Sequence, residues 1–330
     1  MIDLALIGAG RIGAVHADSI CAANDARLSW VVDVFEDPAR KLAEAYGAKP
    51  ATDPAEALAD PDVQGILITS PTDTHLELIL AGVRAEKAVF CEKPLDLDMS
   101  RVDSDLGEIQ AGKVPVLVGF NRRYDPNFRA VFDAVNDGSI GELEIVKITS
   151  RDPSPPPIEY INVSGGLFRD MMIHDLDLAR WLLGEEPVEV FAASSCLVEP
   201  EIGAAGDVDT AIVMMKTESG KLCQIDNSRR AVYGYDQRVE AFGSKGMAKA
   251  DNVSTNTVEV WDAERIHREK PPHFFIERYT AAYRAEMSHF LDVILGKAMP
   301  SVTVQDGRQA LALADAALAS SESGKSEVPS

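Results

Sequence analysis

The sequence has few cysteines and none in a paired motif. Its four cysteines, Cys21, Cys91, Cys196 and Cys223, lie far apart in the 330 residues. Cysteine zinc sites and disulfide-stapled scaffolds need regular, closely matched spacings, so the sequence disfavours both. The metal-binding HExxH pattern and the GxSxG motif of serine hydrolases are also missing. We therefore predict no metal site, and the isolated thiols favour the reducing cytoplasm as the location.

Basic residues and long apolar runs are scarce as well. Lys and Arg number 32 against 53 Asp and Glu, which gives a formal net charge of -21. So negative a surface repels nucleic-acid phosphates and anionic lipids, which excludes nucleic acid and membrane surfaces as expected partners, whereas a neutral polyol or sugar meets no such barrier. No run approaches the roughly 20 apolar residues that cross a bilayer. The opening MIDLALIGAG has no basic segment, so it predicts a buried strand and not a signal peptide.

The hydrophobic pattern changes near residue 120, and 330 residues are enough for two ordinary cores. Before that point, short apolar runs alternate with helical patterns of about 10–15 residues, which predicts a parallel sheet covered on both faces. After it, strand-like runs recur with few helices, which predicts an open, mostly antiparallel sheet. We therefore predict an α/β fold with two domains: a doubly wound parallel sheet over 1–120, and an α+β domain with an open sheet over 121–330.

The same pattern places the individual elements. The expected strands are 4–7, 28–32, 65–69, 88–91 and 116–119 in the first half, and 143–150, 188–197, 210–217, 221–228, 237–242 and 257–261 in the second. One helix, 166–183, interrupts the second series. Two helices close the chain. The first has apolar residues at helical spacing from Ile276 to Ile294, and the second begins near Thr303, which can cap it with Asp306 reaching back.

A glycine motif, Gly8-Ala9-Gly10-Arg11-Ile12-Gly13, joins the first predicted strand to the first predicted helix. The first glycine permits a tight turn, the second lets the backbone approach a pyrophosphate, and the third lets the helix pack close to the strand. The helix N-terminus adds free N–H groups and a partial positive charge. Glycines are common in turns, but this position between strand and helix predicts a dinucleotide site.

Asp33 ends the second predicted strand, twenty residues beyond Gly13. An acidic side chain at this point accepts hydrogen bonds from the adenosine ribose hydroxyls and repels a 2′-phosphate. It therefore predicts NAD as the cofactor in preference to NADP. The alternative is a strand-end aspartate that only stabilises a turn.

Glu92-Lys93-Pro94 follows the fourth predicted strand. Ligands of doubly wound sheets bind at the carboxyl ends of the strands, so we expect Lys93 to direct its ammonium group toward the cofactor. The alternative is a surface lysine in a loop. His75 is expected either to line the same cleft or to pack in the core, and His16 is expected to be a packing residue. We also assign Arg11, Ile12, Thr69, Pro71, His75 and Glu92 to the cofactor site.

Asp170, His174 and Asp177 are spaced four and three residues apart in the predicted helix 166–183, so they share one face. The rest of the helix is mostly apolar. An aspartate one turn before a histidine can hold the ring and favour its protonated form. Such a histidine could act as the general base that removes a hydroxyl proton while the carbon gives up hydride. The alternative is a solvent-facing pair of small energetic value.

Several segments together resemble the Gfo/Idh/MocA oxidoreductases, and within them the inositol 2-dehydrogenases. These segments are GAGRIGAVHA, the strand-ending Asp33, CEKPLDLD, GFNRRYDP and GGLFRDMMIHDLDLARWLLG. FRDMMIHDLD and the YGYD of Tyr233 to Asp236 are the parts that point to the subgroup. The resemblance covers the chain from the first strand to the closing helices.

The resemblance implies a set of functional residues. The catalytic Lys, Asp and His of the family fall on Lys93, Asp170 and His174, with His174 as general base, Asp170 supporting it and Lys93 polarising the oxygen. Substrate hydroxyl contacts fall on Arg123, Asp152, Asp170, His174 and Tyr235. Some relatives carry Asn where this chain has Asp152, and a His where it has Ser150, which affects the choice among inositols and pyranoses. The resemblance also implies an NAD-binding Rossmann domain over 1–120 and a substrate and oligomerisation domain over 121–330, whose closing helices can pack back on the first. It further implies a homotetramer formed through the exposed face of the second sheet.

The leading hypothesis is therefore NAD-dependent oxidation of myo-inositol, or a close isomer, to an inosose. It requires an ammonium group from the first domain and an imidazole from the second to act on one alcohol-bearing carbon. One rival keeps the chemistry but oxidises an aldose at C1, with NAD or NADP. The other is a cofactor-binding sensor without turnover, which would not need Lys93, Asp170 and His174.

Overall fold

The computed structural model describes all residues from 1 to 330, and they form two compact units. The first unit comprises Met1–Tyr124 and Ala281–Leu311, and the second comprises Asp125–Thr280 and Ala312–Ser330. Each contains one six-stranded sheet. The assignment of residues 1–120 to the cofactor and 121–330 to the substrate remains a prediction.

The sheet of the first unit is entirely parallel, in the order β3-β2-β1-β4-β5-β6. Its strands are β1 (Ile2–Ile7), β2 (Ala26–Val32), β3 (Lys49–Ala51), β4 (Val63–Ile68), β5 (Ala88–Glu92) and β6 (Val116–Gly119). This is the doubly wound order of dinucleotide-binding domains, in which the chain reverses direction across the sheet between β1 and β4. The predicted Rossmann fold is confirmed.

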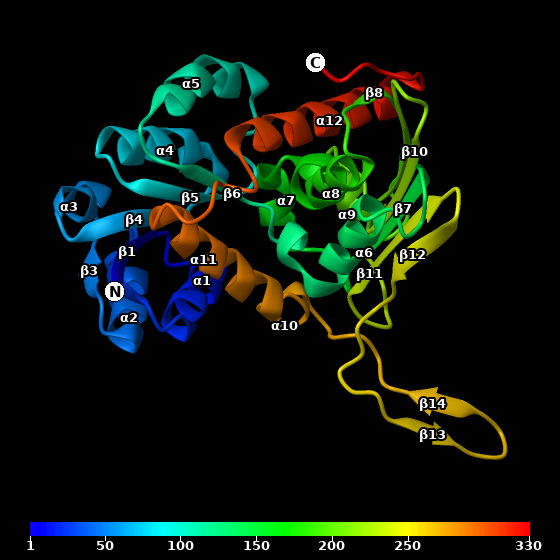
Figure 1. Cartoon of the computed structure of the whole chain (residues 1–330), viewed down its shortest axis with the longest axis horizontal. Helices are drawn as coiled ribbons and strands as arrows, with labels where there is room; N and C mark the ends of the chain where they lie inside the picture. The colour runs from blue at the N-terminus through cyan, green and yellow to red at the C-terminus, as the bar shows by residue number, and fades with distance from the viewer. The chain divides into compact units, whose positions relative to one another are not determined.

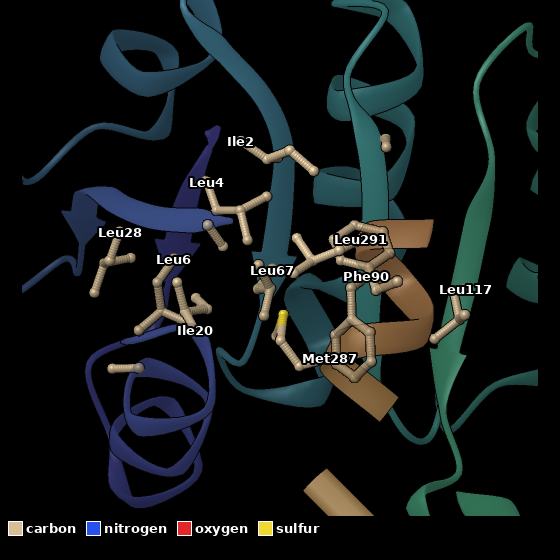
Figure 2. Close-up of a cluster of buried hydrophobic side chains, with 14 of the residues drawn as sticks. Ile2, Leu4, Leu6, Ile20, Leu28, Leu67, Phe90, Leu117, Met287 and Leu291 are labelled. Atoms are coloured by element: carbon tan, nitrogen blue, oxygen red, sulfur yellow. The ribbon is translucent and has the colours of Figure 1, made fainter. Parts of the chain in front are cut away.

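Helices cover both faces of this sheet, as its almost wholly buried strands require. Figure 1 shows α4 and α5 on one face and α1, α2 and α11 on the other. The helices of the unit are α1 (Arg11–Ala22), α2 (Glu36–Tyr46), α3 (Pro54–Ala59), α4 (His75–Arg84), α5 (Met99–Ala111) and α11 (Thr280–Ile294). The core in Figure 2 joins Leu4, Leu67 and Phe90 of the strands to Met287 and Leu291 of α11. The late helix α11 is thus part of the first core.

The sheet of the second unit is mixed, in the order β12-β11-β7-β10-β9-β8, and only its β7–β10 pair is parallel. The strands are β7 (Leu143–Arg151), β8 (Pro187–Ser195), β9 (Thr210–Thr217), β10 (Leu222–Ser228), β11 (Asp236–Gly243) and β12 (Gly246–Ala250). The predicted open, mostly antiparallel sheet is confirmed. Strand β12 was not expected from the sequence.

One face of the second sheet is covered by helices, and the other is exposed. The helices are α6 (Pro126–Asn136), α7 (Ile158–Ser164), α8 (Ile173–Leu183), α9 (Pro200–Ala204) and α10 (Phe275–Arg278). Phe132 of α6 stacks on Trp181 of α8 with the ring centroids 4.0 Å apart. On the opposite face, Ile212 and Met214 of β9 are about half exposed.

Several elements differ from their predicted form. The predicted helix 166–183 begins at Leu167, and its first six residues, Leu167–Met172, form a π-helix before α8. The first closing helix is interrupted at Tyr279, between α10 and α11. The last predicted strand, 257–261, is not in the main sheet: β13 (Glu259–Trp261) pairs only with β14 (Ile266–Arg268) in an exposed hairpin. The second closing helix, α12 (Val304–Ser323), begins as predicted, with Thr303 N–H and hydroxyl donating to Asp306.

Three further observations concern membrane spans, metal ions and cysteines. The structure contains no helix with the length and apolarity that a membrane span requires. No three His, Cys, Asp or Glu side chains gather in a way that could hold a metal ion. All four cysteines are free thiols, with Cys91 and Cys223 buried.

Candidate active site

The glycine loop follows β1 and opens α1, and two of its glycines are sterically required. Gly8 has φ of +109°, and a Cβ there would lie 2.5 Å from the backbone of Ser70. A Cβ on Gly13 would lie 2.1 Å from the Gly8 carbonyl oxygen. Around Gly10, by contrast, there is space for a Cβ within the chain. The chain itself therefore does not require a glycine there, and the predicted close approach of a pyrophosphate would account for it.

The electrostatics of the loop also suit an anion. Helix α1 has twelve residues, no side-chain cap and no acidic residue in its first turn. Its N-terminal N–H groups and partial positive charge therefore have no counter-charge in that turn. Together with the space around Gly10, this arrangement fits the pyrophosphate of a dinucleotide. Arg11 and Ile12 are the first two residues of the helix.

Asp33 follows β2 and lies beside the glycine loop. Its Oδ2 accepts the Ala9 N–H at 2.8 Å, and its Oδ1 accepts the Phe35 N–H at 3.0 Å. The second bond is the turn contact of the alternative explanation, whereas the first ties the carboxylate to the dinucleotide motif. A carboxylate has about four acceptor positions, so both oxygens keep capacity for ribose hydroxyls.

Replacing Asp33 with serine is expected to weaken the use of NAD and to improve the use of NADP. Losing charge-assisted bonds to the ribose should raise the KM for NAD about 10- to 100-fold. NADP use should rise, because the repulsion of its 2′-phosphate is removed. Steady-state kinetics with both cofactors measure this, with the exposed Asp37→Asn as control. A parallel loss with NAD and NADP would instead indicate a damaged loop.

Thr69 and Pro71 follow β4, next to β1 in the sheet. The Thr69 hydroxyl lies 2.7 Å from the Gly8 carbonyl oxygen and 3.1 Å from that of Ile7. It therefore fixes the turn that carries the glycine motif. Pro71 precedes the short 3₁₀ turn Thr72–Thr74 that leads into α4. Direct contacts of both residues with the cofactor remain predictions.

Lys93 is half-buried and stands directly after β5, whose last residue is Glu92. The next carbonyl, that of Pro94, lies 2.7 Å from Nδ1 of His75, and the Nε2 of the same ring lies 2.9 Å from the Ser70 carbonyl oxygen. Burial lowers the pKa of His75. The histidine thus links the segment after β4 to the segment that carries Lys93.

The second group of predicted residues lies in the second unit, around the π-helix. Gly166 has φ of +80°, and the Leu167 N–H donates to Oδ1 of Asp207 at 3.0 Å. A Cβ on Gly166 would lie 2.7 Å from the same oxygen. The π-helix begins directly after these contacts, and this wider helical form is frequent at functional sites in other proteins. Asp170 lies within the π-helix and His174 in the first turn of α8, and both are partly exposed.

Asp170 is held by two residues that the sequence analysis did not identify. The Tyr160 hydroxyl donates to its Oδ1 at 2.8 Å, and the buried Arg229 guanidinium lies 3.5 Å from its Oδ2. Desolvation, and then the Asp170 carboxylate, raise the pKa of Tyr160, which keeps the phenol a neutral donor. Arg229 also lies 3.8 Å from Asp207. The positive charge of Arg229 compensates the Asp170 carboxylate for the partial loss of its hydration.

The third member of the predicted stripe has a structural environment. Asp177 is 1% exposed, and its Oδ1 lies 3.6 Å from Nη1 of Arg180 in the next turn of α8. It is therefore buried against a charged partner, while Asp170 and His174 are only partly buried. Asp177 thus differs from Asp170 and His174 in having a buried, structural environment.

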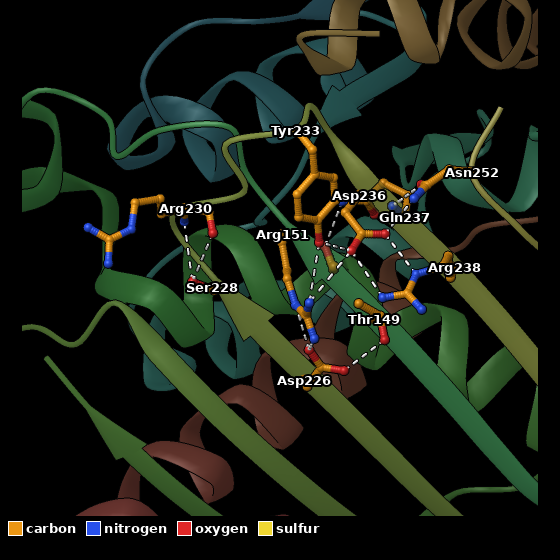
Figure 3. A network of polar contacts seen from close by, with 11 residues as sticks. Thr149, Arg151, Asp226, Ser228, Arg230, Tyr233, Asp236, Gln237, Arg238 and Asn252 are labelled. Carbon is orange, nitrogen blue, oxygen red and sulfur yellow. Dashed lines mark hydrogen bonds and ion pairs between the residues drawn. The ribbon is translucent and has the colours of Figure 1, made fainter. Parts of the chain in front are cut away.

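Asp152 and Tyr235 lie in the second unit at the ends of neighbouring strands. The Asp152 N–H donates to the Ser228 carbonyl at 2.9 Å, and Tyr235 is buried edge-on against the ring of Tyr279. Figure 3 shows the adjoining network, in which Arg151 bridges Asp226 and Asp236. In that network the Tyr233 hydroxyl, Arg238 and Asn252 also donate to Asp236. The YGYD segment thus fixes the strand ends that carry Asp152 and Tyr235.

Arg123 lies in the first unit and is buried. Its guanidinium donates to Oδ1 of Asp306 at 3.0 Å and to the Ser301 carbonyl at 3.1 Å. The side chain therefore joins the 3₁₀ turn after β6 to the start of α12. Its predicted contact with a substrate hydroxyl stays a prediction.

Two family models match the chain. Residues 2–120 match the oxidoreductase family with the NAD-binding Rossmann fold, and residues 128–249 match the GFO/IDH/MocA C-terminal domain. Among known proteins, the chain is 48% identical over 324 residues to the myo-inositol 2-dehydrogenase of Thermotoga maritima, covering 98% of this chain and 97% of that protein. It is 50% identical over 320 residues to the inositol 2-dehydrogenase of Rhizobium meliloti, covering 97% and 96%.

Solved structures of inositol dehydrogenases are also similar to this chain. A myo-inositol dehydrogenase from Corynebacterium glutamicum superposes with a TM-score of 0.96 at 45% identity, covering 100% of this chain and 99% of that one. The scyllo-inositol dehydrogenase of Lactobacillus casei with bound NAD(H) and scyllo-inositol superposes with a TM-score of 0.91 at 28% identity, covering 99% of each chain. The fold is therefore shared along nearly the whole length of both structures.

Proposed function

Because the chain belongs to the Gfo/Idh/MocA family of NAD-binding oxidoreductases, we propose that it oxidises myo-inositol, or a close isomer, to an inosose. The observation that carries this proposal is the 48–50% identity, over nearly the full length, to two inositol 2-dehydrogenases. The chain is an oxidoreductase whose first unit fits NAD, through the glycine loop, the uncompensated N-terminus of α1 and Asp33.

The proposed chemistry assigns one task to each residue. Bound NAD would accept a hydride from the alcohol carbon. Lys93 would donate a hydrogen bond to the alcohol oxygen and stabilise the negative charge that develops on it. His174 would accept the hydroxyl proton as general base. Asp170, held by Tyr160 and Arg229, would orient the substrate or the imidazole.

The remaining predicted residues take binding roles in this proposal. Arg123, Asp152 and Tyr235 would contact substrate hydroxyls, and His75 and Glu92 would shape the cofactor site. The homo-oligomer implied by the family resemblance also remains a proposal. Half-exposed apolar residues of β9, β10, β11 and β12 form the face that such an assembly would bury: Ile212, Met214, Leu222, Phe242 and Met247.

A substrate panel tests the proposed function. The purified chain is incubated with NAD at mildly alkaline pH and with myo-inositol, scyllo-inositol, chiro-inositol, glucose or galactose, and NADH is followed by absorbance. We expect the highest kcat/KM with an inositol and an inosose as product. A preference for the aldoses, with a lactone as product, would support the sugar 1-dehydrogenase instead. NAD binding without turnover of any compound would support the sensor.

A further inference from the structure

Three ionisable side chains that take no part in the proposed hydride and proton transfer lie buried near the start of the Lys93 segment. They are His16 of α1, Glu92 at the end of β5 and Glu286 of α11, all in the first unit. The exposed fractions are 0% for His16, 8% for Glu92 and 0% for Glu286. The sequence suggested that His16 is a packing residue. Its ring does pack edge-on against Phe90 and Tyr283, but its nitrogen has a second role.

Glu92 connects His16 to the backbone of Lys93. Nε2 of His16 lies 2.7 Å from Oε1 of Glu92, and Oε2 of the same carboxylate accepts the Lys93 N–H at 3.3 Å. We take the carboxylate oxygen as the acceptor and the His16 Nε2–H as the donor, because an ionised carboxylate only accepts hydrogen bonds. The two oxygens of one carboxylate therefore fix the imidazole on one side and the start of the Lys93 segment on the other.

The third buried group, Glu286, does not compete with Glu92 for the hydrogen bonds of His16 and Lys93. Burial first, and the nearby charge of Glu92 second, raise the pKa of Glu286 well above its ordinary value. Neither of its carboxyl oxygens has a hydrogen-bond partner. Glu286 is therefore the neutral member of the pair of carboxyl groups, and Glu92 is the one that His16 and the Lys93 N–H hold.

We infer that His16 is a positioning residue for Lys93, acting through the Glu92 carboxylate. The inference rests on the proposed function in taking Lys93 as a catalytic residue. Lys93 follows the last strand residue directly, so a shift of Glu92 moves the Cα from which the ammonium group is placed. His75 restrains the same segment from its other end, at the Pro94 carbonyl. Removing the His16 contact leaves the buried Glu92 carboxyl without its imidazole partner. We then expect Glu92 and the start of the Lys93 segment to shift toward solvent.

Two substitutions separate positioning from packing. In His16→Gln the side-chain amide nitrogen can occupy the place of Nε2 and still donate to Glu92. In His16→Leu the apolar volume is kept and the donor is lost. Glu286→Gln is the matched control, because it replaces one buried neutral group on the same cluster with another of the same shape. Thermal unfolding and NAD binding are recorded for every variant.

We expect His16→Leu to lower kcat about 10- to 100-fold, as displacement of a catalytic group does, with the KM values within about threefold of the parent. His16→Gln and Glu286→Gln should keep most of the activity. Equal losses in the Leu and Gln variants, or full activity in the Leu variant, would overturn the inference. If His16→Leu folds poorly, His16→Asn replaces it, because its shorter amide cannot reach Glu92.

A second readout does not depend on turnover. Acetic anhydride acetylates lysines, and mass spectrometry of the Lys93 peptide gives the labelling rate with and without NAD. We expect NAD to protect Lys93 in the parent and in His16→Gln, and to protect it much less in His16→Leu. Equal protection in all three would overturn the inference even if no polyol is oxidised. Loss of protection in His16→Leu alone supports it even if the proposed substrate is wrong.

Discussion

Replacing Lys93 with methionine is expected to lower kcat for inositol oxidation about 10²- to 10³-fold, the typical effect of removing one donor to a developing oxyanion. Methionine keeps most of the length of the side chain and removes the ammonium group. Because Lys93 is only half-buried, the free energy of unfolding should change little. Stopped-flow or steady-state NADH formation measures the first effect, and chemical denaturation measures the second.

The chain supplies a matched control at the other end of β5. Lys87 precedes the strand, and its Nζ donates to the carbonyl oxygens of Asp60 at 2.9 Å and Val63 at 2.7 Å. Lys87→Met should therefore cost about 1–3 kcal/mol of stability through the loss of both hydrogen bonds, with kcat per folded molecule unchanged. Lys93→Met with normal turnover, or two variants with the same loss, would remove Lys93 from the catalytic set.

The parts of the fold that the sequence predicted are those with local causes. The Thr303–Asp306 cap joins residues three positions apart, and Gly13 closely approaches the Gly8 carbonyl oxygen within the same loop. The parallel sheet follows from runs of apolar residues that must be buried on both faces. These signals are readable from one chain because the physics acts within a single strand or turn.

The parts that it missed depend on distant partners. Arg229 meets Asp170 across 59 positions, and His16 meets Glu92 across 76, so no spacing pattern reveals either pair. The π-helix has the same apolar composition as an α-helix, so the residue pattern does not distinguish the two forms. The Asp207 carboxylate that accepts the Leu167 N–H at its start lies forty positions away. A usable signal did exist for Arg229: a partly buried aspartate such as Asp170 requires a cation or several donors nearby.

The end of the chain shows the same limit. Its polar residues from about 320 onward look like a frayed tail in sequence, yet α12 continues to Ser323 and Glu327 forms a backbone bridge with Val190 of β8. The Ser320 hydroxyl lies 2.6 Å from the Lys325 carbonyl and 2.9 Å from the Ala192 nitrogen. A polar sequence is compatible with order here because the backbone of β8 supplies the hydrogen-bond partners.

Replacing His174 with glutamine should lower kcat about 10²- to 10⁴-fold, the range for loss of a general base. The variant keeps a polar side chain but cannot take up the hydroxyl proton. Asp177→Asn, on the same helix, is the control: Asp177 is buried beside Arg180, so stability should fall while turnover per folded molecule stays normal.

The double variant Lys93→Met/His174→Gln tests whether the two residues act on one substrate oxygen. If the ammonium group stabilises the charge that the imidazole helps to create, each residue has little left to contribute once the other is gone. The double variant should then be about as slow as the slower single variant. Fully multiplicative losses would instead mean that Lys93 and His174 act in separate steps, and His174 would no longer be the base for the oxygen that Lys93 polarises.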